Sequence, residues 1–198
     1  MHPGLLLSLR RQGREVVPLT LRTDADTRII VISGPNAGGK SVTLKTIAIV
    51  QYMMQCGLLP TLYSNSHMGI FAKILIDIGD EQSIENDLST YSSHLRNMRV
   101  FLTKSGPDTL FLADEMGSGT EPQIGGAIAQ AILSKLNQEK AFGVVTTHYQ
   151  NLKTFANEAA GMARRSIFVK FGKGEKRTNV IRATPVSTST GISWDLNV

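Results

Sequence analysis

The sequence has little that would suit an exported or membrane-bound protein. It contains a single cysteine, Cys56, so a disulfide framework is excluded and a reducing cytoplasm is favoured. It has no run of 18 or more apolar residues, and its amino-terminal leucines precede arginines instead of following them. We therefore predict neither a membrane span nor a secretory signal. Cys56 itself falls in a helical pattern and is expected to pack.

An excess of basic charge is also missing from most of the chain. Residues 1–162 hold 14 basic and 14 acidic side chains, whereas residues 163–198 hold seven basic and two acidic ones and carry the whole net charge of +5. Such a tail fits a solvated segment or a surface that touches phosphate backbones, and the first interpretation is favoured. The length of 198 residues and the hydrophobic content of 41% suit one α/β domain.

What the sequence does contain is a phosphate-binding loop. The β-branched residues 29–32 predict a buried strand, and residues 34–41, GPNAGGKS, then fit the pattern G-x-x-x-x-G-K-[ST] before a helix. The loop N–H groups and the helix dipole bind phosphate, Lys40 can reach the β- and γ-phosphates, and the Ser41 hydroxyl can coordinate Mg²⁺. The predicted nucleotide-binding residues are Gly34, Pro35, Asn36, Ala37, Gly38, Gly39, Lys40 and Ser41.

Two further strands end in residues suited to phosphate chemistry. The apolar strand over residues 109–113 leads into Asp114 and Glu115. At such a position Asp114 can help to hold Mg²⁺, and Glu115 can orient or deprotonate the attacking water. The strand over residues 141–147 leads into His148, which could reach the γ-phosphate because the carboxyl ends of parallel strands share one edge.

The remaining pattern predicts alternating strands and helices. Further strands are expected over residues 15–21 and 72–78, and residues 166–171 and 179–183 could form a hairpin. Helices are expected from the phosphate loop to Gly57, from Ser89 or Thr90 as N-cap to about residue 102, over residues 121–136 and over residues 150–160. The last stretch, after about residue 183, is expected to be weakly structured.

Helical spacing also predicts which side chains face the core. For the three longer helices the predicted apolar positions are Leu44, Ile47, Ala48, Tyr52 and Met53 in the first, Tyr91, Leu95, Met98 and Leu102 in the second, and Ile124, Ala127, Ile128, Ala131, Ile132 and Leu136 in the third.

The order of these motifs resembles the ABC-type ATPases, and their wording resembles the MutS family of DNA-repair ATPases. The stretches that carry the likeness are GPNAGGKS at residues 34–41, DEMGSGTEP at residues 114–122 and TTHY at residues 146–149. GDEQSIENDLSTYSSH at residues 79–94 is similar to the type-two branch, often called endonuclease MutS-two. The resemblance covers about residues 2–162.

The resemblance implies an α/β fold of the ABC-type P-loop NTPases, with a mostly parallel central sheet, flanking helices and a mixed or antiparallel edge. It implies an ATPase domain over residues 1–162, followed by a basic tail over residues 163–198, and the cofactors ATP and Mg²⁺. Asp114 and Ser41 would hold the metal, Glu115 would activate water and His148 would contact the γ-phosphate. In a head-to-tail homodimer, Ser89 and Thr90 would serve the ATP of the partner subunit.

By the same resemblance, ATP-driven closure would be coupled to mismatched or branched DNA, or to stalled ribosomes, through domains that this sequence does not contain. Members of the branch carry a core and clamp region before the ATPase and a coiled coil and nuclease-like Smr domain after it. Three alternatives stay open: a nucleotide-binding module with little hydrolysis, an ATPase of a transporter, and a kinase with a lid that uses Arg164, Arg165 and Arg177. Against the transporter, the sequence has LSTYS where transporter ATPases have LSGGQ.

Overall fold

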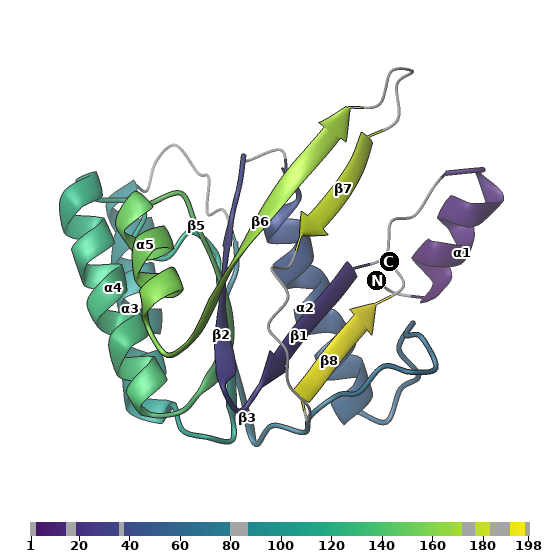
Figure 1. The fold of residues 1–198 in the computed structure, drawn as a ribbon, viewed down its shortest axis with the longest axis horizontal. Coiled ribbons are helices and arrows are strands. Elements are labelled where there is room, and N and C mark those ends of the chain that lie inside the picture. The colour runs from purple at the N-terminus through teal and green to yellow at the C-terminus, as the bar shows by residue number, and fades with distance from the viewer. Residues whose placement is uncertain are drawn as a thin grey trace.

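The fold is a single central sheet with helices on both faces and a small two-stranded sheet beside it (Figure 1). The structure is a computed structural model that describes residues 3–14, 19–35, 38–79, 87–171, 177–182 and 191–196. Its helices are α1 (Pro3–Arg11), α2 (Lys40–Gln55), α3 (Asp87–Lys104), α4 (Pro122–Gln138) and α5 (Gln150–Glu158). Its strands are β1 (Leu19–Asp24), β2 (Thr27–Ser33), β3 (Lys73–Asp77), β4 (Thr109–Ala113), β5 (Phe142–Thr147), β6 (Gly161–Phe171), β7 (Arg177–Arg182) and β8 (Gly191–Leu196).

The six-stranded sheet confirms the predicted fold class. Its strand order is β3-β4-β5-β2-β6-β7, and every neighbouring pair is parallel except β6 and β7, which run antiparallel. The strand before the phosphate loop, β2, therefore lies inside the sheet, between β5 and β6. An antiparallel strand at the edge of a parallel sheet is the mixed edge that the sequence predicts.

Each face of the sheet is covered by a different set of helices. Ile29 and Val31 of β2 pack with side chains of α3, α4 and α5, while Ile30 and Ile32 pack with α2 and β1. This alternation along a fully buried strand explains why residues 29–32 are apolar without interruption. Figure 1 shows the same layering, with α3, α4 and α5 gathered at one side and α2 on the other face of the sheet.

The apolar faces of the helices differ in detail from those predicted. In α2, Leu44, Ile47 and Met53 are buried as expected, but Tyr52 is 65% exposed. In α3, Met98 is buried together with Phe101, whereas Leu95 is 40% and Leu102 is 37% exposed. The side chain of Tyr91 lies outside the described residues. In α4 the buried face is shifted, because close packing selects small residues near its start. The buried residues of α4 are Gly125, Gly126, Ala129, Ile132, Leu133 and Leu136.

Several segments differ from the predicted pattern at the two ends of the chain. Residues 3–11 form α1, which was not predicted, and β1 begins at Leu19 and ends at Asp24. Of the strand expected over residues 15–21, residues 15–18 lie outside the described residues. The final stretch, expected to be weakly structured, contains β8, which pairs antiparallel with β1 from Leu19↔Leu196 to Asp24↔Gly191.

The tail does not separate from the sheet at the expected point. β6 runs through Met162 and pairs with β2 as far as Ser166, and it then forms an antiparallel pair with β7 up to Phe171↔Arg177. The predicted hairpin strands over residues 166–171 and 179–183 correspond to this pair. A domain boundary near residue 162 stays a prediction, and it falls inside a strand.

Cys56 does not pack in the core as expected. It is exposed at the end of α2, where Gly57 adopts a positive φ of 74° and ends the helix. Among the described residues, every helix is too short or too polar to cross a membrane.

Candidate active site

The carboxyl ends of four parallel strands bring the predicted site residues to one edge of the sheet. Ser33, the last residue of β2, is level with Thr147, the last residue of β5, and Ala113 of β4 is level with both Val145 and Asp77. The residues that follow these strands are therefore neighbours, although they come from separate parts of the sequence.

The phosphate loop leads from β2 directly into α2. Gly39 caps this helix with a left-handed backbone, φ 84° and ψ 20°, which a glycine adopts without strain. Lys40 is 2% exposed, and its Nζ donates to the Gly34 carbonyl at 2.9 Å. The lysine therefore lies folded back over the loop that would surround the phosphates. Asn36 and Ala37 lie outside the described residues.

Thr146 joins the two acidic residues at the end of β4. Its hydroxyl donates to Asp114 Oδ1 and accepts a hydrogen bond from the Glu115 N–H at 2.9 Å. Asp114 is 8% exposed, and its own N–H donates to the Asp77 carbonyl at 2.8 Å. Thr146 is fully buried, so these bonds fix the Asp114 carboxylate and the Glu115 backbone in one arrangement.

Glu115 has an unusual backbone conformation. Its φ of 48° lies in the left-handed region, which is unfavourable for a residue with a side chain. The hydrogen bonds from its N–H to Thr146 and from the Ser118 N–H to its carbonyl hold this conformation. Backbone strain of this kind concentrates at functional sites, and here it falls on the residue predicted to activate water. The Glu115 side chain is partly exposed, so water can reach it.

Tyr149 links His148 to the loop after Glu115. The His148 side chain is exposed, and its ring centroid lies 4.3 Å from that of Tyr149, which is buried. The Tyr149 hydroxyl donates to the Gly117 carbonyl at 2.9 Å, and the Tyr149 N–H donates to the Thr147 hydroxyl at 3.0 Å. The position of His148 and the position of the Gly117 loop therefore depend on one buried aromatic residue.

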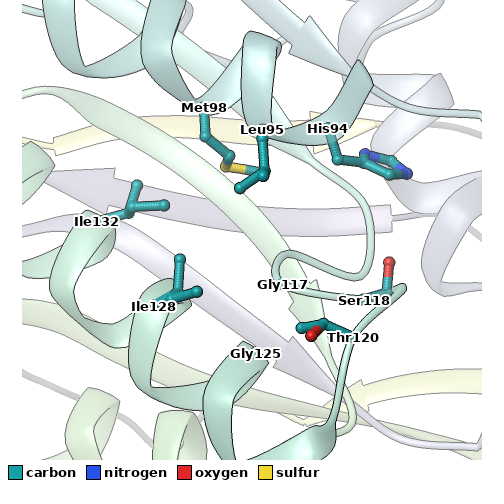
Figure 2. Close-up of a pocket in the computed structure, with 9 residues that line it drawn as sticks. All are labelled: His94, Leu95, Met98, Gly117, Ser118, Thr120, Gly125, Ile128 and Ile132. Atoms are coloured by element: carbon teal, nitrogen blue, oxygen red, sulfur yellow. The ribbon is translucent and has the colours of Figure 1, made fainter. Parts of the chain in front are cut away.

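The loop after Glu115 is wedged between two helices (Figure 2). A crevice of about 10 Å³ lies between the loop and the helices, which is room for about one water molecule. Figure 2 shows His94, Leu95 and Met98 projecting from α3 on one side and Ile128 and Ile132 from α4 on the other, with Gly117, Ser118 and Thr120 of the loop beside them. The loop is thus packed against α3 and α4.

Ser89 and Thr90 lie in the first turn of α3, and not at its N-cap as predicted, because the helix begins at Asp87. Their side chains lie outside the described residues. The following turn of the same helix nevertheless lies beside the site. His94 of α3 lines the same crevice as the loop that follows Glu115.

The donor set fits a magnesium ion that is shared with nucleotide. Asp114 offers a buried carboxylate, and Ser41 offers a hydroxyl in the first turn of α2. These hard oxygen ligands suit Mg²⁺, which takes its other ligands from phosphates and water. No cluster of three or more His, Cys, Asp or Glu side chains that could hold a metal occurs among the described residues.

Three residues of the site were given no role of their own in the sequence, although Thr146 and Tyr149 fall within the TTHY stretch. Thr146, Asp77 and Tyr149 all sit at or next to the carboxyl ends of strands, where the alternation pattern gives no sign of their role. A polar residue at the end of an apolar strand is the signal that could have indicated Thr146 and Asp77, since a buried polar side chain needs a partner.

The phosphate loop follows the central strand β2, and the Asp-Glu pair follows β4, which is separated from β2 by β5 alone. This arrangement defines the class of P-loop ATPase domains. The chain matches the family described as MutS domain V over residues 30–194, which is most of its length. The chain belongs to the MutS family. The match continues beyond residue 162, where the motif resemblance was expected to end.

Individual relatives agree with this assignment. The chain is 51% identical over 152 residues to the Endonuclease MutS2 of Pelotomaculum thermopropionicum, which covers 74% of the chain and 19% of that relative. It is 43% identical over 172 residues to the Endonuclease MutS2 of Thermomicrobium roseum, covering 84% and 22%. It is 49% identical over 138 residues to the Endonuclease MutS2 of Enterococcus faecalis, and this match covers 70% of the chain and 18% of that relative. The chain thus spans about a fifth of the length of these curated relatives.

Proposed function

We propose that the chain binds ATP with Mg²⁺ and hydrolyses it to ADP and phosphate. The observation that carries this proposal is the meeting of the phosphate loop, the Thr146-bridged Asp114 and Glu115, and His148 at one edge of the sheet. The loop amides, the α2 dipole and Lys40 supply positive potential for the phosphates. Asp114 and Ser41 hold the metal, and no covalent intermediate is required.

In this proposal, Glu115 activates the attacking water and His148 contacts the γ-phosphate. Glu115 directly follows the end of β4 with a left-handed backbone, and its partly exposed side chain can meet a water. His148 is exposed, and Tyr149 fixes its backbone, so its ring can turn toward a phosphate without disturbing the core. Catalysis then consists of positioning and electrostatic stabilisation of the transferred group.

We further propose that two chains pair head to tail around two ATP molecules. One observation supports this: Glu115 and His148 are open to solvent in the single chain, whereas phosphate transfer to a chosen water requires bulk water to be excluded. The first turn of α3, with Ser89 and Thr90, would cover the nucleotide of the partner. Closure with ATP and opening after hydrolysis would couple the chain to mismatched or branched DNA, or to a stalled ribosome, in DNA repair or recombination.

A kinase is less well supported. An arginine-rich lid would need arginines on a segment that can move over the site. Arg164 and Arg165 instead lie in β6 and Arg177 lies in β7, both of which are strands of the central sheet, and Arg164 Nε donates to the Ser33 hydroxyl at 3.3 Å.

The test combines sedimentation velocity with phosphate release, using the wild-type chain and Glu115→Gln. We expect wild type to release phosphate and to form dimers when ATP·Mg²⁺ is added. Glu115→Gln keeps the shape and the ATP affinity but removes the base, so it should accumulate as an ATP-bound dimer with turnover reduced by roughly a hundredfold or more.

Three results would contradict the proposal. Equal turnover by Glu115→Gln would remove Glu115 from its role. A rate per chain that stays constant with concentration, in a sample that remains monomeric, would show that no composite site is needed. ATP binding without turnover in any state would leave the nucleotide-binding module as the function of this chain.

A further inference from the structure

Asp77 is a buried carboxylate at the end of β3 that the hydrolysis reaction does not use. It is 5% exposed, and both of its oxygens accept hydrogen bonds from one helix. His94 Nδ1 lies 2.9 Å from Oδ2, and Asn97 Nδ2 donates to Oδ1 at 2.9 Å. Because a carboxylate can only accept, His94 must carry its proton on Nδ1 in this bond. Residues three apart lie on the same face of a helix, so α3 is held to β3 at two adjacent points.

The main chain of Asp77 is joined to the candidate active site. Its carbonyl accepts the hydrogen bond from the Asp114 N–H at 2.8 Å, and Asp114 is in turn joined to Thr146 and through it to Glu115. A continuous series of hydrogen bonds therefore runs from helix α3 through Asp77 to the two acidic residues. The residues of this series lie at or directly after the ends of strands β3, β4 and β5, or in helix α3.

Helix α3 is also the element whose first turn holds Ser89 and Thr90. His94 follows Thr90 by four residues, which is about one helical turn, and the two residues lie on the same side of the helix. A helix moves as a rigid body over such a distance, so a shift at His94 displaces the first turn as well.

We propose that Asp77 is a positioning residue, which couples nucleotide and metal at Asp114 to the position of α3 through His94 and Asn97. The inference rests on the proposed function of the site and names a means of its regulation. Asp114 would hold the ion with its carboxylate, and a change in its position there would reach Asp77 through the Asp77 carbonyl and α3 through the Asp77 carboxylate. The surface offered to the ATP of a partner chain then depends on whether the chain holds its own nucleotide.

The surroundings of Asp77 allow the link to be cut without unfolding the chain. A cavity of about 210 Å³ lies over it, lined by Ile76, Asp77, Ile78, Gly79, Ser93, His94 and Asn97. In Asp77→Ala, water in this space can replace the carboxylate as partner of His94 and Asn97. The carbonyl of residue 77 and its bond from Asp114 remain, so only the attachment of α3 is lost.

The experiment measures hydrogen exchange of the α3 amides in the full 198-residue chain, with and without the non-hydrolysable analogue adenylyl imidodiphosphate and Mg²⁺. The chain is kept at a concentration at which sedimentation shows a monomer, so that protection cannot come from a partner. We expect the analogue to slow exchange in the wild-type helix by about threefold or more, and this ratio to fall to about one in Asp77→Ala and His94→Ala. The analogue affinity should change by less than about twofold.

Two matched variants separate coupling from general stability. His94→Asn keeps a donor at the position of Nδ1 and should restore at least about half of the wild-type response. Lys73→Ala removes the 3.9 Å pair with Asp108 at the opposite end of β3 and should respond as wild type does. A merely structural role for Asp77 would raise exchange in both states and leave their ratio unchanged.

The inference is overturned if Asp77→Ala keeps the wild-type ratio, or if wild type binds the analogue and α3 does not respond. The second result leaves the proposed nucleotide function intact. Failure of wild type to bind the analogue at all would instead refute the proposed function, and the inference with it.

Discussion

Two neighbouring glycines of α4 provide a stringent test of how the loop after Glu115 is packed. A Cβ added at Gly125 would lie 2.3 Å from the Gly117 carbonyl oxygen and 2.8 Å from the Tyr149 hydroxyl, whereas one added at Gly126 would lie 2.7 Å from Asn151 Oδ1. The first obstacle is backbone in a tight turn, and the second is the end of a flexible side chain. Gly125→Ala and Gly126→Ala are therefore a matched pair.

Both substitutions gain helix propensity of about 1 kcal/mol, and they differ in the cost of making room. For Gly125→Ala, overpacking of about 1–3 kcal/mol and the loss of the Tyr149–Gly117 hydrogen bond, about 1 kcal/mol, leave a net loss of about 1–3 kcal/mol in the free energy of unfolding. At this chain length that lowers Tm by roughly 2–12 °C. For Gly126→Ala, the loss of the Asn151–Gly126 hydrogen bond, about 1 kcal/mol, cancels the gain.

The assay is thermal unfolding followed by circular dichroism, with phosphate release measured on the folded proteins. Because the Gly117 loop must shift by about 1 Å, we expect Gly125→Ala to lose about tenfold or more in turnover while it keeps its ATP affinity. A Gly125→Ala chain as stable as Gly126→Ala would refute the packing described for this loop. Normal turnover in a destabilised Gly125→Ala would show that the loop position does not matter for hydrolysis.

Three other substitutions test single contacts of the site. Lys40→Ala should abolish measurable ATP binding in an equilibrium titration, and retained affinity would contradict the phosphate loop. Tyr149→Phe removes one neutral hydrogen bond, so Tm should fall by roughly 2–4 °C. Turnover should fall without a change in ATP affinity. Unchanged turnover would show that Tyr149 does not contribute to catalysis. Thr146→Val leaves a buried Asp114 oxygen and the Glu115 N–H without their partner, so calorimetry should show a loss of about 2–3 kcal/mol in the free energy of unfolding. A loss near zero would mean that the Thr146 hydrogen bonds are not maintained.

Strands and their ends were predictable because their signal is local. In a run such as residues 110–113 every position is apolar because β4 is buried on both faces, and the polar residues that follow mark its end. The parallel arrangement then brings Asp114 and His148 to the phosphate loop without further information. The fold class and the family were accordingly correct, while the roles of the individual residues remain predictions.

Helix faces and the partners of polar residues were predicted less well, because they depend on contacts between distant segments. Tyr52 continues the apolar spacing of α2, yet its side chain is exposed instead of packed in the core. The face of α4 is set by the need to place Gly125 against Gly117, which periodicity cannot reveal. Asp77 looks like an ordinary polar end of a strand until α3 supplies His94 and Asn97. The strand β8 depends on β1, more than 160 residues earlier.

The site divides into a part that one chain completes and a part that it leaves open. Lys40, Asp114 and Thr146 are buried, and the hydrogen bonds described for them are made within the chain, so these three residues of the proposed phosphate and metal site are held by one chain alone. His148 is exposed and Glu115 is partly exposed, and a carboxylate that bulk water can reach gains little as a base from its position alone. Binding and hydrolysis therefore make different demands on this fold. Under the proposed function, binding needs one chain, whereas efficient hydrolysis needs a cover over the exposed residues. Since α3 is joined to the cradle through Asp77, the element proposed to provide that cover is also the element able to respond to what the cradle holds.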